Sequence, residues 1–247
     1  MTYPAIQVLD LTVRFGDFVA IDRLTFGADY ERVRGVIGPN GAGKTTLLDV
    51  ITGKSKPESG DVLLDGQFNL ADMSEAERAL AGIGRKFQKP SVFEALTVAE
   101  NLDLALRLYP KSLRRDIVAP MRRKREPIDR VLEQIGLAGS RNAVAGALSH
   151  GEKQWLEIGM VLIMNPKVLL LDEPVAGLSD AETERTAELV KALRSPERSI
   201  VIVEHDMNFV ERVADQVTVL HEGRTLFDGS MADARKDSRV IDVYIGR

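Results

Sequence analysis

Residues 38–46 read GPNGAGKTT and match the pattern G-x-x-x-x-G-K-[ST] of a phosphate-binding loop. The apolar run RVRGVIG leads into them, and the segment KTTLLDVIT follows with helical spacing up to Gly53. This is the strand–loop–helix context that the pattern requires. We expect Gly38, Gly41 and Gly43 to allow a tight loop whose backbone amides point inward, with the helix start adding positive potential.

Each polar residue of the loop has an expected task toward a nucleoside triphosphate. Lys44 would reach the β- and γ-phosphates as a point charge, Thr45 would offer its hydroxyl to Mg²⁺, and Thr46 would donate to phosphate. The complete set of nucleotide-binding residues that we predict in this loop is Gly38, Pro39, Asn40, Gly41, Ala42, Gly43, Lys44, Thr45 and Thr46.

A second acidic motif follows a continuous apolar run, in the segment KVLLLDEP at residues 167–174. Such a run fits a strand buried on both faces of a parallel sheet. Asp172 would then stand at the carboxyl end of the strand, where ligands bind in open α/β sheets, and would hold Mg²⁺ through water. Glu173 is the candidate general base for the attacking water. The alternative is that this acidic pair only ends the strand and caps the next helix.

The pattern around these motifs predicts an α/β fold with a mainly parallel sheet in a single domain, residues 1–247. Alternating runs at the amino terminus predict an antiparallel β-subdomain. Helical spacing predicts a helical subdomain inserted at approximately residues 90–160. Within it, the basic stretch 111–126 fits a solvated surface; the alternative is a segment that faces a membrane partner or anionic lipid.

Composition limits the classes of function. The chain has a net charge of −4 and 28% charged residues, which gives no reason to expect nucleic acid as a partner. It has no cysteine, which excludes disulfides, thiolate zinc sites and a cysteine nucleophile. We find no signal peptide and no run of about 18 apolar residues that could span a membrane. A function at a membrane would therefore depend on a partner.

The segment LSHGE at residues 148–152 begins another predicted helix, and Ser149 and Glu152 form a capping box. A well-started helix is the plain interpretation. The capping box does not require Gly151, however, and a helix start with free backbone donors is an anion site. Since the phosphate loop covers one side of its nucleotide, a second anion site suggests a second chain that covers the other side.

These motifs, in this order, resemble an ATP-binding subunit of an ABC transporter over nearly the whole chain. GPNGAGKTT corresponds to the Walker A loop, LSHGE to the family signature LSGGQ, LLLDEP to Walker B and AGLSD (176–180) to the D-loop. Single residues of the family pattern are matched by Phe15 as the adenine-stacking aromatic, Gln88 of the Q-loop and His205 as the switch histidine.

The resemblance implies that two subunits bind two ATP molecules head to tail. Each ATP would lie between the Walker A loop of one chain and Ser149, Gly151 and Glu152 of the other. Gln88 would bind Mg²⁺ or the attacking water and link it to the helical subdomain, and His205 would hold the γ-phosphate and orient the water. The catalytic residues would be Glu173, His205 and Gln88, and the Mg²⁺ ligands Thr45, Gln88 and Asp172. His150 and Glu152 depart from the usual glycine and glutamine, which puts the strength of the contact in trans in doubt.

The resemblance also implies partners and a place in the cell. The partners are transmembrane permease subunits, a second ATPase subunit of the same or a homologous kind and, indirectly, a solute-binding protein; the place is the cytoplasmic face of the inner membrane. Trp155 and the run LEIGM resemble urea-type importers, so urea or a short-chain amide is the expected solute. The alternatives are a branched-chain amino acid importer and an ABC exporter. Phe93 and Leu96 would line the groove for the permease, unless they only pack in the core.

Overall fold

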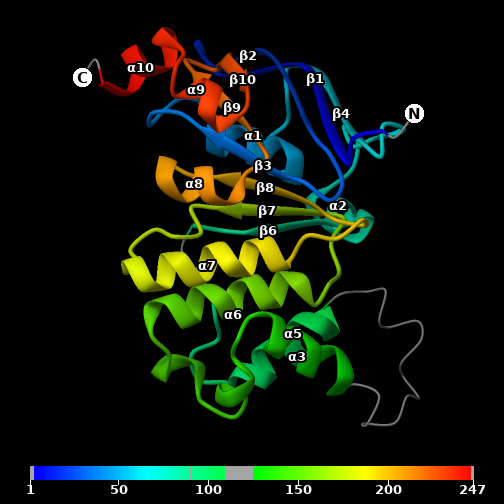
Figure 1. The fold of residues 1–247 in the computed structure, drawn as a ribbon. Coiled ribbons are helices and arrows are strands. Elements are labelled where there is room, and N and C mark those ends of the chain that lie inside the picture. The colour runs from blue at the N-terminus through cyan, green and yellow to red at the C-terminus, as the bar shows by residue number, and fades with distance from the viewer. Residues whose placement is uncertain (1–2, 89–90, 109–124, 246–247) are drawn as a thin grey trace.

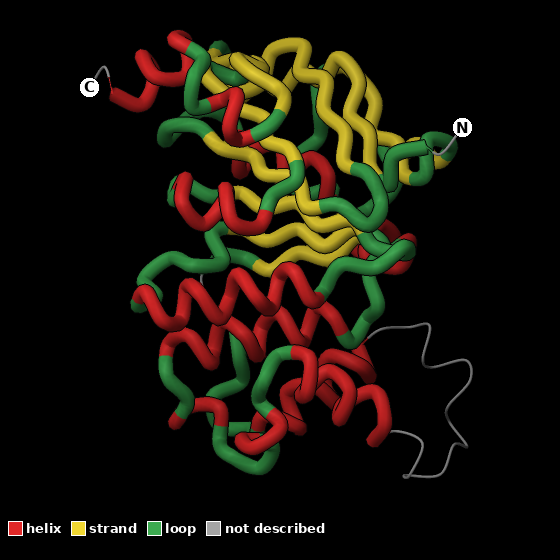
Figure 2. Tube along the Cα trace, in the orientation of Figure 1, coloured by secondary structure: helices red, strands yellow, loops and turns green. Residues whose placement is uncertain are grey.

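A computed structural model describes residues 3–88, 91–108 and 125–245 of the chain. Figure 1 shows two sheets in one half of the molecule and a layer of helices in the other, and Figure 2 gives the same view by secondary structure. The first sheet has the strand order β2-β1-β4-β5 and is antiparallel. Its strands are β1 (Ile6–Phe15), β2 (Phe18–Ala28), β4 (Ser59–Leu64) and β5 (Phe68–Asn69).

The second sheet positions the site. Its order is β10-β9-β3-β8-β7-β6, and all neighbours run parallel except β10, which pairs antiparallel with β9. Its strands are β3 (Val33–Ile37), β6 (Ile83–Lys86), β7 (Val168–Asp172), β8 (Ser199–Val203), β9 (Gln216–His221) and β10 (Arg224–Gly229). Every residue of β3, β6, β7 and β8 is buried, as expected for parallel strands covered on both faces.

Helices cover both faces of this sheet. Helix α1 lies between the two sheets, whereas α6 and α7 run across the opposite face, with α3 and α5 beyond α6 (Figure 1). The helices are α1 (Lys44–Thr52), α2 (Glu75–Ala81), α3 (Val98–Leu108), α5 (Arg125–Gln134), α6 (His150–Leu162), α7 (Asp180–Ala192), α8 (Met207–Val213), α9 (Met231–Ala234) and α10 (Ser238–Ile245).

The apolar side chains form a core on each side of the parallel sheet. One cluster joins the two sheets and α1, with Leu47 and Leu48 fully buried in it. Another joins the opposite face to the helical layer, where Trp155 and Leu156 of α6 lie among residues of α3, α5 and α7. The helical layer is therefore anchored to the sheet mainly through α6 and α7.

The structure confirms the α/β fold with an antiparallel amino-terminal sheet, a mainly parallel sheet and a helical insert. A capping box formed by Ser74 and Glu77 is present at the start of α2. The sequence reading missed the two-residue strand β5 and the four-residue helix α9, which are too short to show a period. The basic stretch 111–126 falls almost wholly outside the described residues.

Candidate functional site

Four parallel strands bring the predicted motifs to one edge of the sheet. The phosphate loop follows β3, Gln88 follows β6, Asp172 ends β7, and Glu204 and His205 follow β8. Because parallel neighbours end at the same edge, residues up to about 170 positions apart in the chain meet there. The charges of Glu173, Asp172 and Glu204 all act on Lys44, which places these groups around the phosphate loop.

The phosphate loop has the backbone that its glycines were expected to provide. Gly38, Gly41 and Gly43 have φ angles of 153°, 81° and 101°. A Cβ atom on Gly38 would lie 2.3 Å from the carbonyl oxygen of Leu220, so no other residue fits there. The loop closes around Lys44, whose Nζ donates to the carbonyl oxygens of Gly38 at 2.6 Å and Pro39 at 2.9 Å.

Helix α1 begins without a side-chain cap. Its N-cap is Gly43, no side chain accepts from its first amides, and its first turn holds no acidic residue. By contrast, Ser74, Ser149, Ser179, Asp206 and Ser230 cap the helices that follow them. The start of α1 therefore keeps its donors and its positive potential for an anion, as a phosphate site requires. Burial lowers the pKa of Lys44, and the nearby carboxylates oppose this shift.

The carboxylate of Asp172 is buried and paired. Arg85 of β6 donates to Asp172 Oδ2 at 2.7 Å and to Asp49 Oδ1 of α1 at 2.5 Å. Arg85 thus joins the Walker B strand to the helix of the phosphate loop. The sequence analysis missed this residue, although a charged Arg-Lys pair in a strand of otherwise small or apolar residues was a signal.

Glu173 and Gln88 contact each other directly. The amide Nε2 of Gln88 donates to the carboxylate of Glu173. Glu173 has a left-handed backbone, with φ of 46°, and its amide donates to the carbonyl oxygen of Val203 at 2.9 Å. This turn directs the side chain away from the strand toward the Gln88 side of the edge. The pair is consistent with a base and a residue that holds its water, the roles expected for them.

Glu204, which the sequence analysis did not single out, holds the backbone of His205, the predicted switch histidine. It is fully buried, and it accepts the amides of Val175 at 3.1 Å and His205 at 3.0 Å. Burial raises the pKa of its carboxyl group, and these amides oppose the shift. The imidazole of His205 is exposed, with Nδ1 at 3.6 Å from Glu204 Oε2. The structure thus places His205 at the same edge as Lys44, free to turn toward a bound nucleotide.

The start of α6 differs from the free anion site that the sequence suggested. The capping box is formed, with Ser149 Oγ accepting the amide of Glu152 at 3.2 Å and Glu152 accepting the amide of Ser149 at 2.9 Å. Ser149 Oγ also donates to Glu182 Oε1 at 3.4 Å, and the Gly151 amide donates to the same carboxylate. In the single chain these donors are already engaged. Lys153, which follows the capping box, pairs with Glu94.

Phe15 lies at the end of β1, paired with Phe18 across the β1–β2 turn. The two rings are 53% and 63% exposed, which leaves them available as a stacking surface. Phe18 was not singled out from the sequence. Phe93 is 47% exposed, which fits a partner surface better than core packing.

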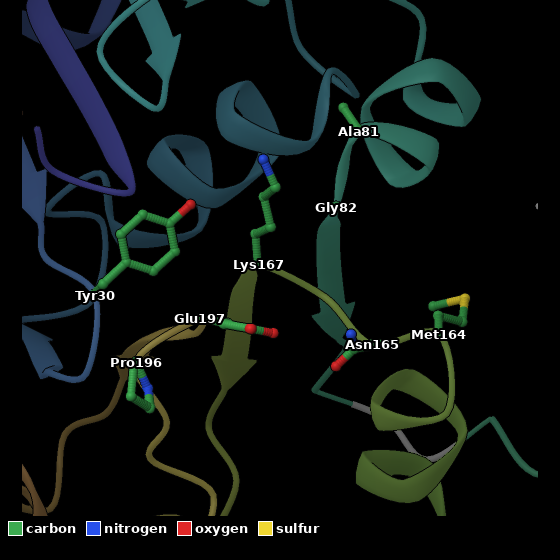
Figure 3. Close-up of a pocket in the computed structure, with 8 residues that line it drawn as sticks. All are labelled: Tyr30, Ala81, Gly82, Met164, Asn165, Lys167, Pro196 and Glu197. Atoms are coloured by element: carbon green, nitrogen blue, oxygen red, sulfur yellow. The ribbon is translucent and has the colours of Figure 1, made fainter. Parts of the chain in front are cut away.

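A cavity of about 500 Å³ lies at the opposite edge of the parallel sheet, where the strands begin. Figure 3 shows Lys167, Gly82 and Glu197 around it, each just before a strand, together with Tyr30. None of the predicted nucleotide-binding residues lines this cavity. The predicted nucleotide-binding residues lie instead at the open edge formed by the strand ends.

The oxygen atoms at the edge fit Mg²⁺. A hydroxyl (Thr45, exposed) and a carboxylate (Asp172) are hard ligands of the kind that Mg²⁺ takes together with phosphate oxygens.

In residues 3–88, 91–108 and 125–245, no helix is both long and apolar enough to cross a bilayer.

Comparisons with known proteins agree with this geometry. Residues 21–176 match the family model described as ABC transporter. The chain is 33% identical to the high-affinity branched-chain amino acid transport ATP-binding protein BraF of Pseudomonas aeruginosa and 34% identical to LivG, the protein of the same description in Escherichia coli K12. Both alignments cover 100% of this chain and 99% of the relative.

Solved structures show the same fold. The ADP conformation of MJ1267, an ATP-binding cassette of an ABC transporter, superposes with a TM-score of 0.88 at 30% identity, with 100% of both chains covered. A nucleotide-free ATP-binding cassette from an ABC transporter gives 0.86 at 28% identity, covering 99% of this chain and 100% of the other. The match to the family model spans more than half of the sequence and includes the phosphate loop and the acidic end of β7. The chain therefore belongs to the ABC transporter family, as a subunit that binds and hydrolyses ATP.

Proposed function

We propose that the chain powers the uptake of a small polar solute, with a branched-chain amino acid as the first candidate. The observation that carries this is similarity over full length: BraF and LivG align with 100% of the chain and 99% of their own length. The sulfate/thiosulfate import ATP-binding protein CysA of Mycobacterium bovis is also 33% identical, but only 63% of it is covered. The branched-chain relatives thus match this chain from end to end, whereas CysA is a longer protein.

Urea or a short-chain amide is the second candidate, and it rests on Trp155 and its neighbours. In the structure Trp155 is buried, its Nε1 donates to Thr186 Oγ1 at 2.9 Å, and the guanidinium of Arg185 lies 4.1 Å from the ring centre. These contacts pack α6 on α7. They give Trp155 a structural task and do not bear on the solute, so the amino acid candidate stands first.

The working unit is a pair of ATPase subunits on a pair of permeases at the cytoplasmic face of the membrane. ATP lies between the phosphate loop of one subunit and Ser149 and Gly151 of the other. In each chain the donors of Ser149 and Gly151 contact Glu182. Formation of the pair therefore requires that the partner's γ-phosphate take over these donors. A solute-binding protein delivers the solute to the permeases.

The chemistry that we propose at the edge uses the residues described above. Thr45 and Asp172 would hold a Mg²⁺ ion, which would offset the charge of the phosphates when bound. Glu173 removes a proton from the attacking water, Gln88 holds that water, and His205 and Lys44 contact the γ-phosphate. Phe15 stacks on the adenine.

Uptake of labelled leucine and labelled urea tests the proposal in the source cells that carry Lys44→Ala. Loss of leucine uptake alone supports the amino acid candidate, and loss of urea uptake alone replaces it with the urea candidate. Normal uptake of both, with the variant present at the wild-type level, would overturn the importer proposal in favour of export. Lys191→Ala, an exposed lysine on α7, serves as the control for expression.

A further inference from the structure

The end of β6 holds a buried positive charge with no direct contact to the phosphate loop. Lys86 is 0% exposed, and its Nζ donates to the carbonyl oxygen of Asp172 at 3.4 Å. A buried ammonium is costly unless a counter-charge lies near it. Burial lowers the pKa of Lys86, and among the carboxylates that oppose the shift Glu157 acts most strongly. Glu157 is therefore its main counter-charge.

Glu157 belongs to the signature helix α6 and is itself only 5% exposed. The backbone amides of Ser91 and Phe87 donate to its carboxylate, and these residues stand on either side of Gln88. Its Oε2 has no hydrogen-bond partner within the described part of the chain, and burial raises the pKa of the group to about 7. One buried carboxylate thus accepts amides on both sides of Gln88, and its charge also stabilises the buried ammonium of Lys86.

The surroundings connect this carboxylate to the reacting groups. Gln88 donates to Glu173, and Lys86 holds the carbonyl of the neighbouring Asp172. Glu157 also lies on α6, about two helical turns after Ser149, the residue that caps the start of this helix. A shift of the start of α6 would therefore move Glu157, and with it the amides of Phe87 and Ser91 on either side of Gln88.

We propose that Glu157 is a positioning residue for ATP hydrolysis: its carboxylate, on the signature helix, accepts the amides of Phe87 and Ser91 and so holds Gln88 against Glu173. The proposal rests on the role given to Gln88 above. The competing explanation is that Lys86 and Glu157 only fill the core. The two explanations differ in what happens when the charges are removed without loss of packing.

The test replaces both charges by apolar groups, in Lys86→Leu combined with Glu157→Leu, in the full-length chain. Because the two buried charges are removed together, Tm should fall less than in Glu157→Leu alone, which leaves the charge of Lys86 without that of Glu157. The amides of Phe87 and Ser91 would lose the carboxylate that holds them, and Gln88 between them would be less well placed. We expect kcat for ATP to fall by about 10-fold to 100-fold, because small misplacements of a catalytic group cost that much. KM for ATP should stay within about twofold, since the phosphate loop is untouched.

Three further variants make the result decisive. Glu157→Gln keeps an acceptor oxygen for the amides and should retain more activity than Glu157→Leu. Arg34→Leu combined with Asp228→Leu removes another ion pair, between β3 and β10, and should leave kcat unchanged. Gln88→Ala should reduce kcat, and a wild-type rate in that variant would refute the role of Gln88 itself. If Gln88→Ala is impaired while the double leucine variant hydrolyses ATP at the wild-type rate, the positioning role of Glu157 is refuted.

Discussion

Gly151→Ala should destabilise the chain even without nucleotide. An ideal Cβ on Gly151 would lie 2.5 Å from Glu182 Oε1 and 2.8 Å from its Cδ, closer than real Cβ contacts. Glu182 cannot give way freely, because the amide and the hydroxyl of Ser179 donate to its Oε2 at 3.0 and 2.8 Å. The methyl group must therefore either break the capping box of α7 or shift the start of α6.

The magnitude follows from these two routes. Loss of an N-cap costs about 0.5–2 kcal/mol, and overpacking costs about 1–3 kcal/mol. Since the chain takes the less costly route, we expect a loss of about 0.5–2 kcal/mol in the free energy of unfolding. For a chain of this size, that lowers Tm by about 1–8 °C.

Thermal unfolding of the purified chain, followed by circular dichroism, measures this change. Glu182→Ala removes the group that the methyl would meet, and it should lower Tm on its own by loss of the cap. The double variant Gly151→Ala with Glu182→Ala should unfold near the Tm of Glu182→Ala alone, because the clash is gone. Full additivity of the two single changes, or an unchanged Tm in Gly151→Ala, would refute the argument.

Three further predictions concern the site. Glu173→Gln should bind ATP normally but hydrolyse it about 10²-fold to 10⁴-fold more slowly, and a near wild-type rate in a phosphate-release assay would exclude Glu173 as the base. Ser149→Arg should leave ATP binding to the isolated chain intact while abolishing the ATP-dependent dimer in gel filtration; loss of ATP binding itself would contradict a site shared between two chains. Phe15→Ala should raise KM for ATP by about threefold to tenfold with kcat unchanged, since it removes one aromatic contact, and equal KM values would exclude stacking on Phe15.

Much of the site could be predicted from the sequence because parallel strands all end at the same edge of the sheet. Because 38–46 matches a phosphate loop and 167–174 a buried strand, the rule for parallel strands predicts Asp172 at the same edge of the sheet as Lys44. The capping box at Ser149 was equally predictable, because it depends on residues three positions apart. Local spacing and the common edge thus account for most of the residues that were singled out.

The missed contacts all depend on which elements become neighbours. Arg85 meets Asp172 only because β6 lies next to β7, and no local pattern states that order. Glu182 reaches Ser149 and Gly151 only because α7 starts beside α6. For the same reason, the sequence suggested free donors at the start of α6, whereas the folded chain supplies a carboxylate from elsewhere to occupy them.

The order of the strands also explains why Gln88 and the signature helix can act together. The chain leaves the sheet at the end of β6, forms α3, α5 and α6, and returns as β7 beside the strand it left. Gln88 lies where the chain leaves β6, and α6 is the last helix before the chain enters β7. A tilt of the helical layer would therefore displace Gln88 and Ser149 together, while Lys44 and Asp172 stay fixed in the sheet. Glu157 of α6 contacts the backbone on both sides of Gln88, and this is the contact on which our proposal for ATP hydrolysis rests.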